Sequence, residues 1–151
     1  MSKKKTPRLP KSNSRGRALT LQFAQQAIEQ KVFSQARDSL QQATRLGKPD
    51  VFLIAALKQK IGETYLAQGD FGAARREFAF VLAMPTANLS SAQQSKLQII
   101  KDATQISVAQ SHQFEGNNAQ ARIELLQVVQ RAGVDAGVKA FAKARLAALP
   151  K

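Results

Sequence analysis

Two apolar stripes separated by a glycine constrain the fold of this chain more than any other sequence feature. In the first stripe, residues recur at the steps of three and four that place side chains on one face of a helix: Ile54, Leu57, Ile61 and Tyr65. The second stripe has the same spacing: Ala74, Phe78, Val81 and Leu82. Between the stripes, Gly69 breaks the pattern and Asp70 supplies an oxygen that can cap a new helix. The stretch from Leu57 to Pro85 therefore predicts two antiparallel helices joined by a short turn.

A family resemblance rests on the same stretch. Gly62 lies on the predicted inner face, where the missing side chain allows a second helix to approach closely. The pattern resembles the tetratricopeptide repeat, and the matching residues are Ile61, Gly62, Tyr65, Ala74, Phe78 and Pro85. Lys58 stands where that family has a tryptophan. The resemblance implies a helical repeat that binds other proteins and catalyses no reaction.

Two weaker copies of this unit flank the first. Their second helices repeat the spacing of Ala74, Phe78 and Val81, with Ala36, Leu40 and Ala43 before it and Ala121, Leu125 and Val128 after it. The reference alanines are 38 and 47 residues apart, against about 34 in the family, so longer first helices are expected. We expect an all-α fold, a tetratricopeptide-like α-solenoid of about three helix pairs with a C-terminal capping helix. An unrelated helical bundle is the alternative.

Capping and turn residues predict where the helices begin and end. The first helix is expected from Ala18 to a turn at residues 30–32, and Pro49-Asp50 precedes a long helix over Val51 to Gln68. Another long helix follows the capping residues Asn88, Ser90 and Ser91 and runs to about Phe114. Asp135 caps a final helix whose inward stripe is predicted to be Val138, Phe141, Ala142 and Leu146. We assign residues 18–151 to one repeat domain.

The first 17 residues carry an unusual concentration of positive charge. The whole sequence has a net charge of +13, and over half of that excess comes from seven cations in this segment, which has no acid: Lys3, Lys4, Lys5, Arg8, Lys11, Arg15 and Arg17. With two prolines and few apolar residues, residues 1–17 are predicted to form a disordered basic arm. Such an arm neutralises phosphates, so RNA or DNA is one expected partner. Another acidic partner, a lipid surface, an organelle transit peptide and no dedicated role are the alternatives.

The composition argues against an enzyme. The chain has no cysteine and only one histidine, His112, so neither a thiolate nucleophile nor a cysteine or histidine metal site is expected. The carboxylates are scattered singly, and no glycine-rich phosphate loop occurs. We therefore expect no catalytic residue, cofactor or metal. No apolar run has the length of a membrane span, and the lack of cysteine suits a reducing cytoplasm.

The resemblance also implies where a partner would bind, because the first helices of tetratricopeptide repeats line a concave groove. The polar groove positions transferred to this chain are Gln22, Gln25, Glu29, Gln59, Lys60, Glu63, Gln110 and Gln113. The other positions transferred are Leu21, Ile28, Leu66, Ile106, Ser107 and Phe114. The basic clamp with which some members hold acidic C-termini is not reproduced. Arg75 and Arg76 are expected on the opposite, solvated face.

Two functions follow from these observations. The first is a non-enzymatic protein-binding adaptor that holds a peptide or helix in the groove, with the basic arm as an accessory for anionic partners. The alternative is a nucleic-acid-associated helical repeat factor in which the arm supplies the affinity. We take the first as the core activity, and the amide-rich, weakly charged groove predicts a peptide held by hydrogen bonds and apolar contact more than by ion pairing.

Overall fold

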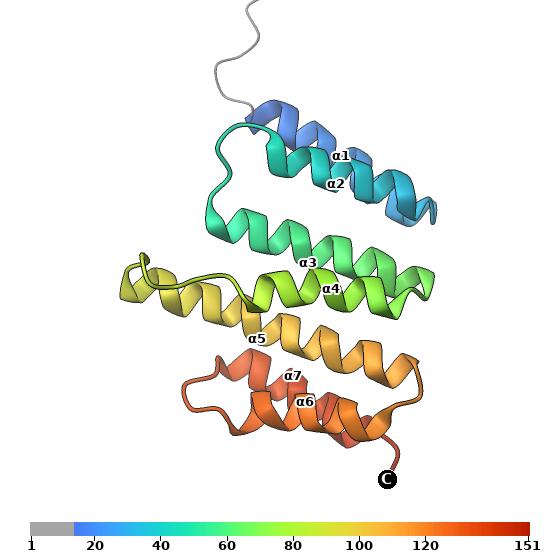
Figure 1. Cartoon of the computed structure of the whole chain (residues 1–151), viewed down its shortest axis with the longest axis vertical. Helices are drawn as coiled ribbons and strands as arrows, with labels where there is room; N and C mark the ends of the chain where they lie inside the picture. Colours follow the sequence, from blue (N-terminus) through green and yellow to red (C-terminus); the bar gives the residue numbers. More distant parts are fainter. Residues whose placement is uncertain (1–13) are drawn as a thin grey trace, which may run out of the picture.

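In the computed structural model, which describes residues 14–151, the chain folds into seven α-helices, and that part of it contains no strand (Figure 1). The helices are α1 (Ser14–Glu29), α2 (Phe33–Arg45), α3 (Val51–Gln68), α4 (Phe71–Leu82), α5 (Ser91–Phe114), α6 (Asn118–Gln130) and α7 (Ala136–Ala148). Each helix packs against the next one along the chain, and α5 also packs against α3 and α7. In Figure 1, α1 and α2 lie at one end of the long axis, α6 and α7 at the other, and α3, α4 and α5 between them. The described residues thus confirm the all-helical prediction.

Side-chain caps fix several of the helix boundaries that the sequence predicts. The Asp50 carboxylate accepts a hydrogen bond from the Leu53 backbone N–H at 2.8 Å, and α3 begins directly after it. Asp70 does the same for α4 through the Ala73 N–H at 3.1 Å. A capping box at Ser90 starts α5: the Ser90 hydroxyl accepts from the Gln93 backbone N–H, and the Gln93 side chain accepts from the Ser90 backbone N–H. These caps satisfy backbone N–H groups that have no partner within the helix.

The turns α1–α2, α3–α4 and α5–α6 share one backbone geometry. Each contains one residue in the left-handed region: Lys31 at φ 60°, Gly69 at φ 85° and Gly116 at φ 84°. The N–H of that residue donates to the carbonyl three residues earlier, and the next N–H donates to the carbonyl five residues earlier. This paired arrangement satisfies the last carbonyls of the preceding helix. The described chain thus contains three helical hairpins that are joined by the same turn.

The first of these turns lacks two features that the others have. Lys31 is the only residue other than glycine with positive φ in the described chain, although side chains disfavour that conformation. The capping position that follows is Val32, which cannot accept a hydrogen bond through its side chain. Asp70 and Asn117 both do so at the equivalent positions.

Small residues allow the paired helices to pack closely, as the sequence predicts. Ala36, Ala74 and Ala121 have no exposed surface at all. Gly62 lies against the ring of the fully buried Phe78, and a Cβ atom built on Gly62 would be only 2.4 Å from the Phe78 Cε1. The Phe78 ring therefore occupies the space that any other residue at position 62 would need.

Two structural details differ from the sequence predictions. The chain is already helical at Ser14, the first described residue, and not only from Ala18, and the Arg17 guanidinium donates to the Leu46 carbonyl, which ties this part of α1 to the α2–α3 loop. Arg15 and Arg17 thus belong to a helix and not to the arm. Phe141 is 55% exposed and does not lie in the core stripe of α7, where Ala142 is fully buried. The rest of the predicted arm, residues 1–13, lies outside the described residues.

Candidate functional site

A hollow of about 470 Å³ lies between helices α3, α5 and α7. Its lining residues are Gln59 and Glu63 from α3, Ala103, Ile106, Ser107 and Gln110 from α5, and Asp135, Gly137, Val138 and Phe141 from the start of α7. We call this set the α3–α5–α7 hollow. It joins three alternate helices because α5 packs against both α3 and α7. Its volume is within the roughly 300–1,000 Å³ of ligand pockets in proteins.

The hollow brings together some of the predicted groove residues and leaves out others. Gln59, Glu63 and Gln110 line it, together with the predicted Ile106 and Ser107. Of the other polar positions, Lys60 and Gln113 are on the same two helices but outside the lining, and Gln22, Gln25 and Glu29 are exposed on α1. The Gln25 amide donates to the Glu29 carboxylate at 3.1 Å. Leu66 is a core residue packed with Ala74 and Phe78, so its placement in the groove is wrong.

Sequence reasoning missed the wall that α7 contributes. Asp135 and Phe141 were predicted as a helix cap and a core residue, and Asp135 does cap α7 through the Gly137 and Val138 N–H groups. In addition, both residues line the hollow. The order of the helices could have indicated these residues. The seventh helix follows the second helix of a hairpin, as the third and fifth helices do, and is therefore expected to lie beside them. An exposed phenylalanine on that helix then faces the same hollow as the polar residues of α3 and α5.

Glu63 experiences an unusual environment within the hollow. Solvent reaches its side chain, but the surrounding walls replace part of its water, and this desolvation raises the pKa of the Glu63 carboxyl. The positive charge of Lys60 opposes the shift without cancelling it. A carboxylate with a raised pKa in a hollow is one whose charge the protein stabilises poorly. A cation placed beside it would relieve that cost.

Two other hollows flank the ion pair of Asp102 and Arg131. One has a volume of about 460 Å³ and lies between the first half of α5 and the α6–α7 loop, and the other, of about 310 Å³, lies between α5 and α6. The buried Asp102 carboxylate accepts from Arg131 and, at 3.0 Å, from the Gln98 amide. The charged groups Asp102 and Arg131 already pair with each other in these hollows, whereas the α3–α5–α7 hollow contains a carboxylate, Glu63, that has no ion-pair partner among the described residues.

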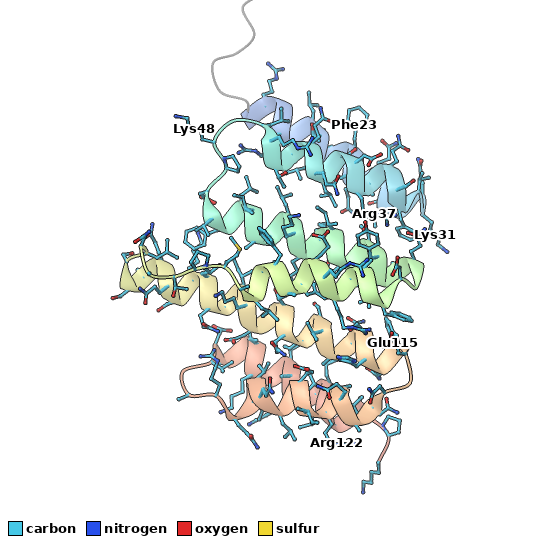
Figure 2. The ribbon with its side chains drawn as sticks, in the orientation of Figure 1. Phe23, Lys31, Arg37, Lys48, Glu115 and Arg122 are labelled. Atoms are coloured by element: carbon cyan, nitrogen blue, oxygen red, sulfur yellow. The ribbon has the colours of Figure 1, made fainter. Side chains whose placement is uncertain are left out.

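The pair Arg75 and Arg76 does not form the uniformly solvated face that the sequence suggests. The Arg75 guanidinium makes a two-bond ion pair with Glu115, at 2.7 and 3.0 Å, and a third hydrogen bond with the Ser111 hydroxyl at 3.3 Å. Glu115 follows the last turn of α5 in Figure 2, so the pair links α4 to the end of α5. The hydrogen bonds from Arg75 hold the pKa of Glu115 below its usual value. Arg76 is exposed.

Of the predicted anion-binding residues, only two lie in the described chain. Arg15 and Arg17 are in the described part of α1, and Arg17 contacts the Leu46 carbonyl. Arg45 and Lys48 lie next to that contact and are exposed, so they add positive charge to the same end of the molecule. Lys48 is visible at that end in Figure 2. The remaining predicted cations, Lys3, Lys4, Lys5, Arg8 and Lys11, lie outside the described residues.

Two further features of the described residues bear on metals and membranes. In residues 14–151, no three histidine, cysteine, aspartate or glutamate side chains come close enough together to hold a metal ion. The single histidine, His112, is partly buried, with Nδ1 4.0 Å from the Glu115 carboxylate. No helix in the described part of the chain combines the length and the apolar character needed to cross a membrane.

Comparison with known proteins yields no relative. No protein-family model matches the sequence, and neither the curated proteins nor the solved structures gave a significant match.

Proposed function

We propose that this chain is a non-enzymatic adaptor that holds a peptide segment of a partner protein in the α3–α5–α7 hollow. The observation that carries this proposal is the lining itself, in which an exposed phenylalanine and the amides Gln59 and Gln110 converge from three separate helices. Apolar contact area beside a few polar groups is the usual composition of a recognition site. In the described residues, nothing in the lining resembles a nucleophile with its base, and this favours binding over catalysis.

The repeated turn supports a tetratricopeptide-like solenoid as the framework of this adaptor. Three hairpins share their turn hydrogen bonds, and their reference alanines Ala36, Ala74 and Ala121 are equally buried. In such a framework, the first helix of each hairpin contributes to one continuous binding face. We propose that α7 closes that face at its C-terminal end, and that the protein works in the cytoplasm.

A second candidate function is binding of RNA or DNA by the N-terminal end of the molecule. The specific observation in its favour is the contact of Arg17 with Leu46, which brings α1 beside the exposed Arg45 and Lys48. These cations would extend the charge of the preceding segment, and Lys and Arg bind phosphates with little sequence preference. The two functions use different ends of the molecule and can coexist.

Site-specific photo-crosslinking tests the first function against the second. A crosslinking amino acid is introduced at Gln110, in the hollow, or at Arg76, on the exposed side of α4, and the cells are treated with nuclease after lysis. We expect a protein crosslinked from Gln110 that survives nuclease, disappears in the Phe141→Ala background and is absent from Arg76. Crosslinks from Arg76 alone would refute the hollow as the docking site. Loss of every crosslink on nuclease treatment would favour the nucleic-acid function.

A further inference from the structure

We propose that the α3–α5–α7 hollow accepts an arginine side chain from the partner segment, with its guanidinium on Glu63 and an adjacent apolar residue against Phe141. This inference rests on the proposed protein-binding function and adds the chemistry of the bound segment. The sequence suggested a groove in which ion pairing matters little. The lining found in the structure favours the opposite, because it is locally acidic in a basic protein.

Glu63 differs from most carboxylates in the described chain because it has no partner. Eight of the ten accept a hydrogen bond or form an ion pair: Glu29, Asp50, Asp70, Glu77, Asp102, Glu115, Glu124 and Asp135. In residues 14–151 the two without such a partner are Glu63 and Asp38. Asp38 is exposed on α2 and does not line the hollow, whereas Glu63 does. Among residues 14–151, Glu63 is therefore the one carboxylate in this hollow that has neither a hydrogen-bond donor nor an ion-pair partner.

No cation of the described chain supplies the missing partner. The two ionisable residues in the lining, Glu63 and Asp135, are both acidic, and no lysine or arginine of residues 14–151 belongs to it. Lys60 acts on Glu63 only at a distance, since the two form no ion pair within 4.0 Å. Asp135 keeps one oxygen on the N–H groups of α7. The hollow thus has two carboxylates to offer to a cation that comes from outside.

The Glu63 carboxylate favours arginine as that cation, and Phe141 favours an apolar residue beside it. The ring of Phe141 is 55% exposed beside the partly buried Val138, and the protein's own Arg145 lies over it with its guanidinium carbon 5.8 Å from the ring centroid, so the remaining surface of the ring suits an apolar side chain. The planar guanidinium binds a carboxylate through two parallel hydrogen bonds, which the compact ammonium group of lysine does not, so Glu63 favours arginine. Because the rest of the protein is strongly basic, a polybasic segment would be repelled. A single arginine among apolar residues meets both conditions.

Peptide selection provides the test. Short random peptides displayed on phage are selected on the full-length protein, and those that also bind the Phe141→Ala variant are discarded. We expect the retained peptides to share an arginine next to an apolar residue. Their Kd is then measured by fluorescence anisotropy, and Glu63→Gln should weaken binding about tenfold or more, as expected for hydrogen bonds to a charged group. Asp38→Asn, which removes the other unpartnered charge, should leave the Kd unchanged.

A double-mutant cycle shows whether the two groups meet. Replacing the peptide arginine with glutamine and Glu63 with glutamine should each weaken binding, while the two changes together should cost little more than one alone. If the two losses simply add, arginine does not contact Glu63 and the inference is wrong. Both Glu63 and Phe141 are exposed, so circular dichroism of these variants should match that of the unchanged protein.

The possible outcomes distinguish failure of the arginine proposal from failure of the proposed adaptor function. Peptides that need Phe141 but carry no arginine, or that ignore Glu63→Gln, would overturn the inference and leave the adaptor function standing. If no selected peptide depended on Phe141 or Gln110, the adaptor function itself would fail. A tenfold gain in peptide affinity on deletion of residues 1–13 would show that the chain's own basic segment competes for the hollow. That result would also overturn the assignment to a partner protein.

Discussion

Replacing Gly62 with alanine should destabilise the protein, although alanine is the better helix former. A Cβ atom at this position would lie 2.4, 2.7 and 3.0 Å from three carbons of the Phe78 ring. Carbon atoms in contact prefer about 3.5–4.0 Å, so the ring would have to move by roughly 1 Å. Phe78 has no exposed surface and is packed among Leu66 and Ala74, which leaves it no space to move into.

The net effect follows from two opposing contributions. Removing a glycine from a helix interior stabilises it by about 1 kcal/mol. Overpacking a rigid core costs about 1–3 kcal/mol and occasionally more, and the short distances at Gly62 argue for the upper part of that range. We therefore expect Gly62→Ala to lower the free energy of unfolding by about 1–2 kcal/mol.

Urea denaturation followed by circular dichroism at the helical band measures this change. Gly72→Ala is the matched control, because the nearest atom to a Cβ there is Arg76 Nη1 at an ordinary 3.8 Å. That variant should be neutral or up to about 1 kcal/mol more stable. Phe78→Leu should lessen the effect of Gly62→Ala when the two are combined, with a coupling of roughly 1–2 kcal/mol. If Gly62→Ala behaved like Gly72→Ala, the close contact between α3 and α4 would be refuted.

Three further predictions concern other parts of the molecule. Arg75→Ala should lower the urea midpoint at neutral pH, because it removes the ion pair with Glu115. The pKa of Glu115 is lowered in the folded state, so the pair stabilises the protein above the unfolded pKa of 4.5 and loses this effect as the pH falls through the folded pKa. The difference in urea midpoint between the variant and the unchanged protein should therefore shrink in acid. An equal difference at all pH values would contradict this. Deleting residues 1–13 should leave the melting temperature unchanged but weaken binding to single-stranded RNA, measured by filter binding. If roughly five phosphates are contacted, the log affinity of the full chain should fall with log salt at a slope of about −3 to −4. A salt-independent affinity would exclude the phosphate contacts. Val32→Asp should raise the free energy of unfolding by about 1 kcal/mol, because it adds the cap that Asp70 supplies in the next hairpin, and no gain in urea denaturation would show that the first turn is already satisfied.

The sequence predicts those features of the fold that depend on neighbouring residues. Asp50 and Asp70 mark the beginnings of α3 and α4, and the fully buried Ala36, Ala74 and Ala121 follow from helical spacing. Such features need only the local periodicity and the capping chemistry of a few adjacent residues. For this reason the predicted bounds of α3, Val51 to Gln68, agree with the structure.

Contacts between distant residues were not predictable in the same way. The bond from Arg17 to the Leu46 carbonyl joins positions 29 residues apart. The ion pair of Arg75 with Glu115 spans 40 residues. Phe141 was misplaced because helical spacing identifies an apolar stripe without showing which of its edges remains uncovered. Of the candidate site, the residues on α3 and α5 could be predicted through the family resemblance, but the wall from α7 could not.

The strained first turn has a consequence for the motions of the folded protein. A side chain at left-handed Lys31 and the missing cap at Val32 each cost about 1 kcal/mol relative to the glycine and the aspartate of the α3–α4 turn. Together they would make transient opening of the α1–α2 hairpin roughly thirtyfold more frequent than with an ideal turn. Because α1 packs mainly against α2, whereas α2 also packs against α3, we expect α1 to separate first while α2 to α7 stay ordered. The backbone amides of α1 should therefore exchange hydrogen with solvent first, and the α3–α5–α7 hollow should keep its shape while α1 opens transiently.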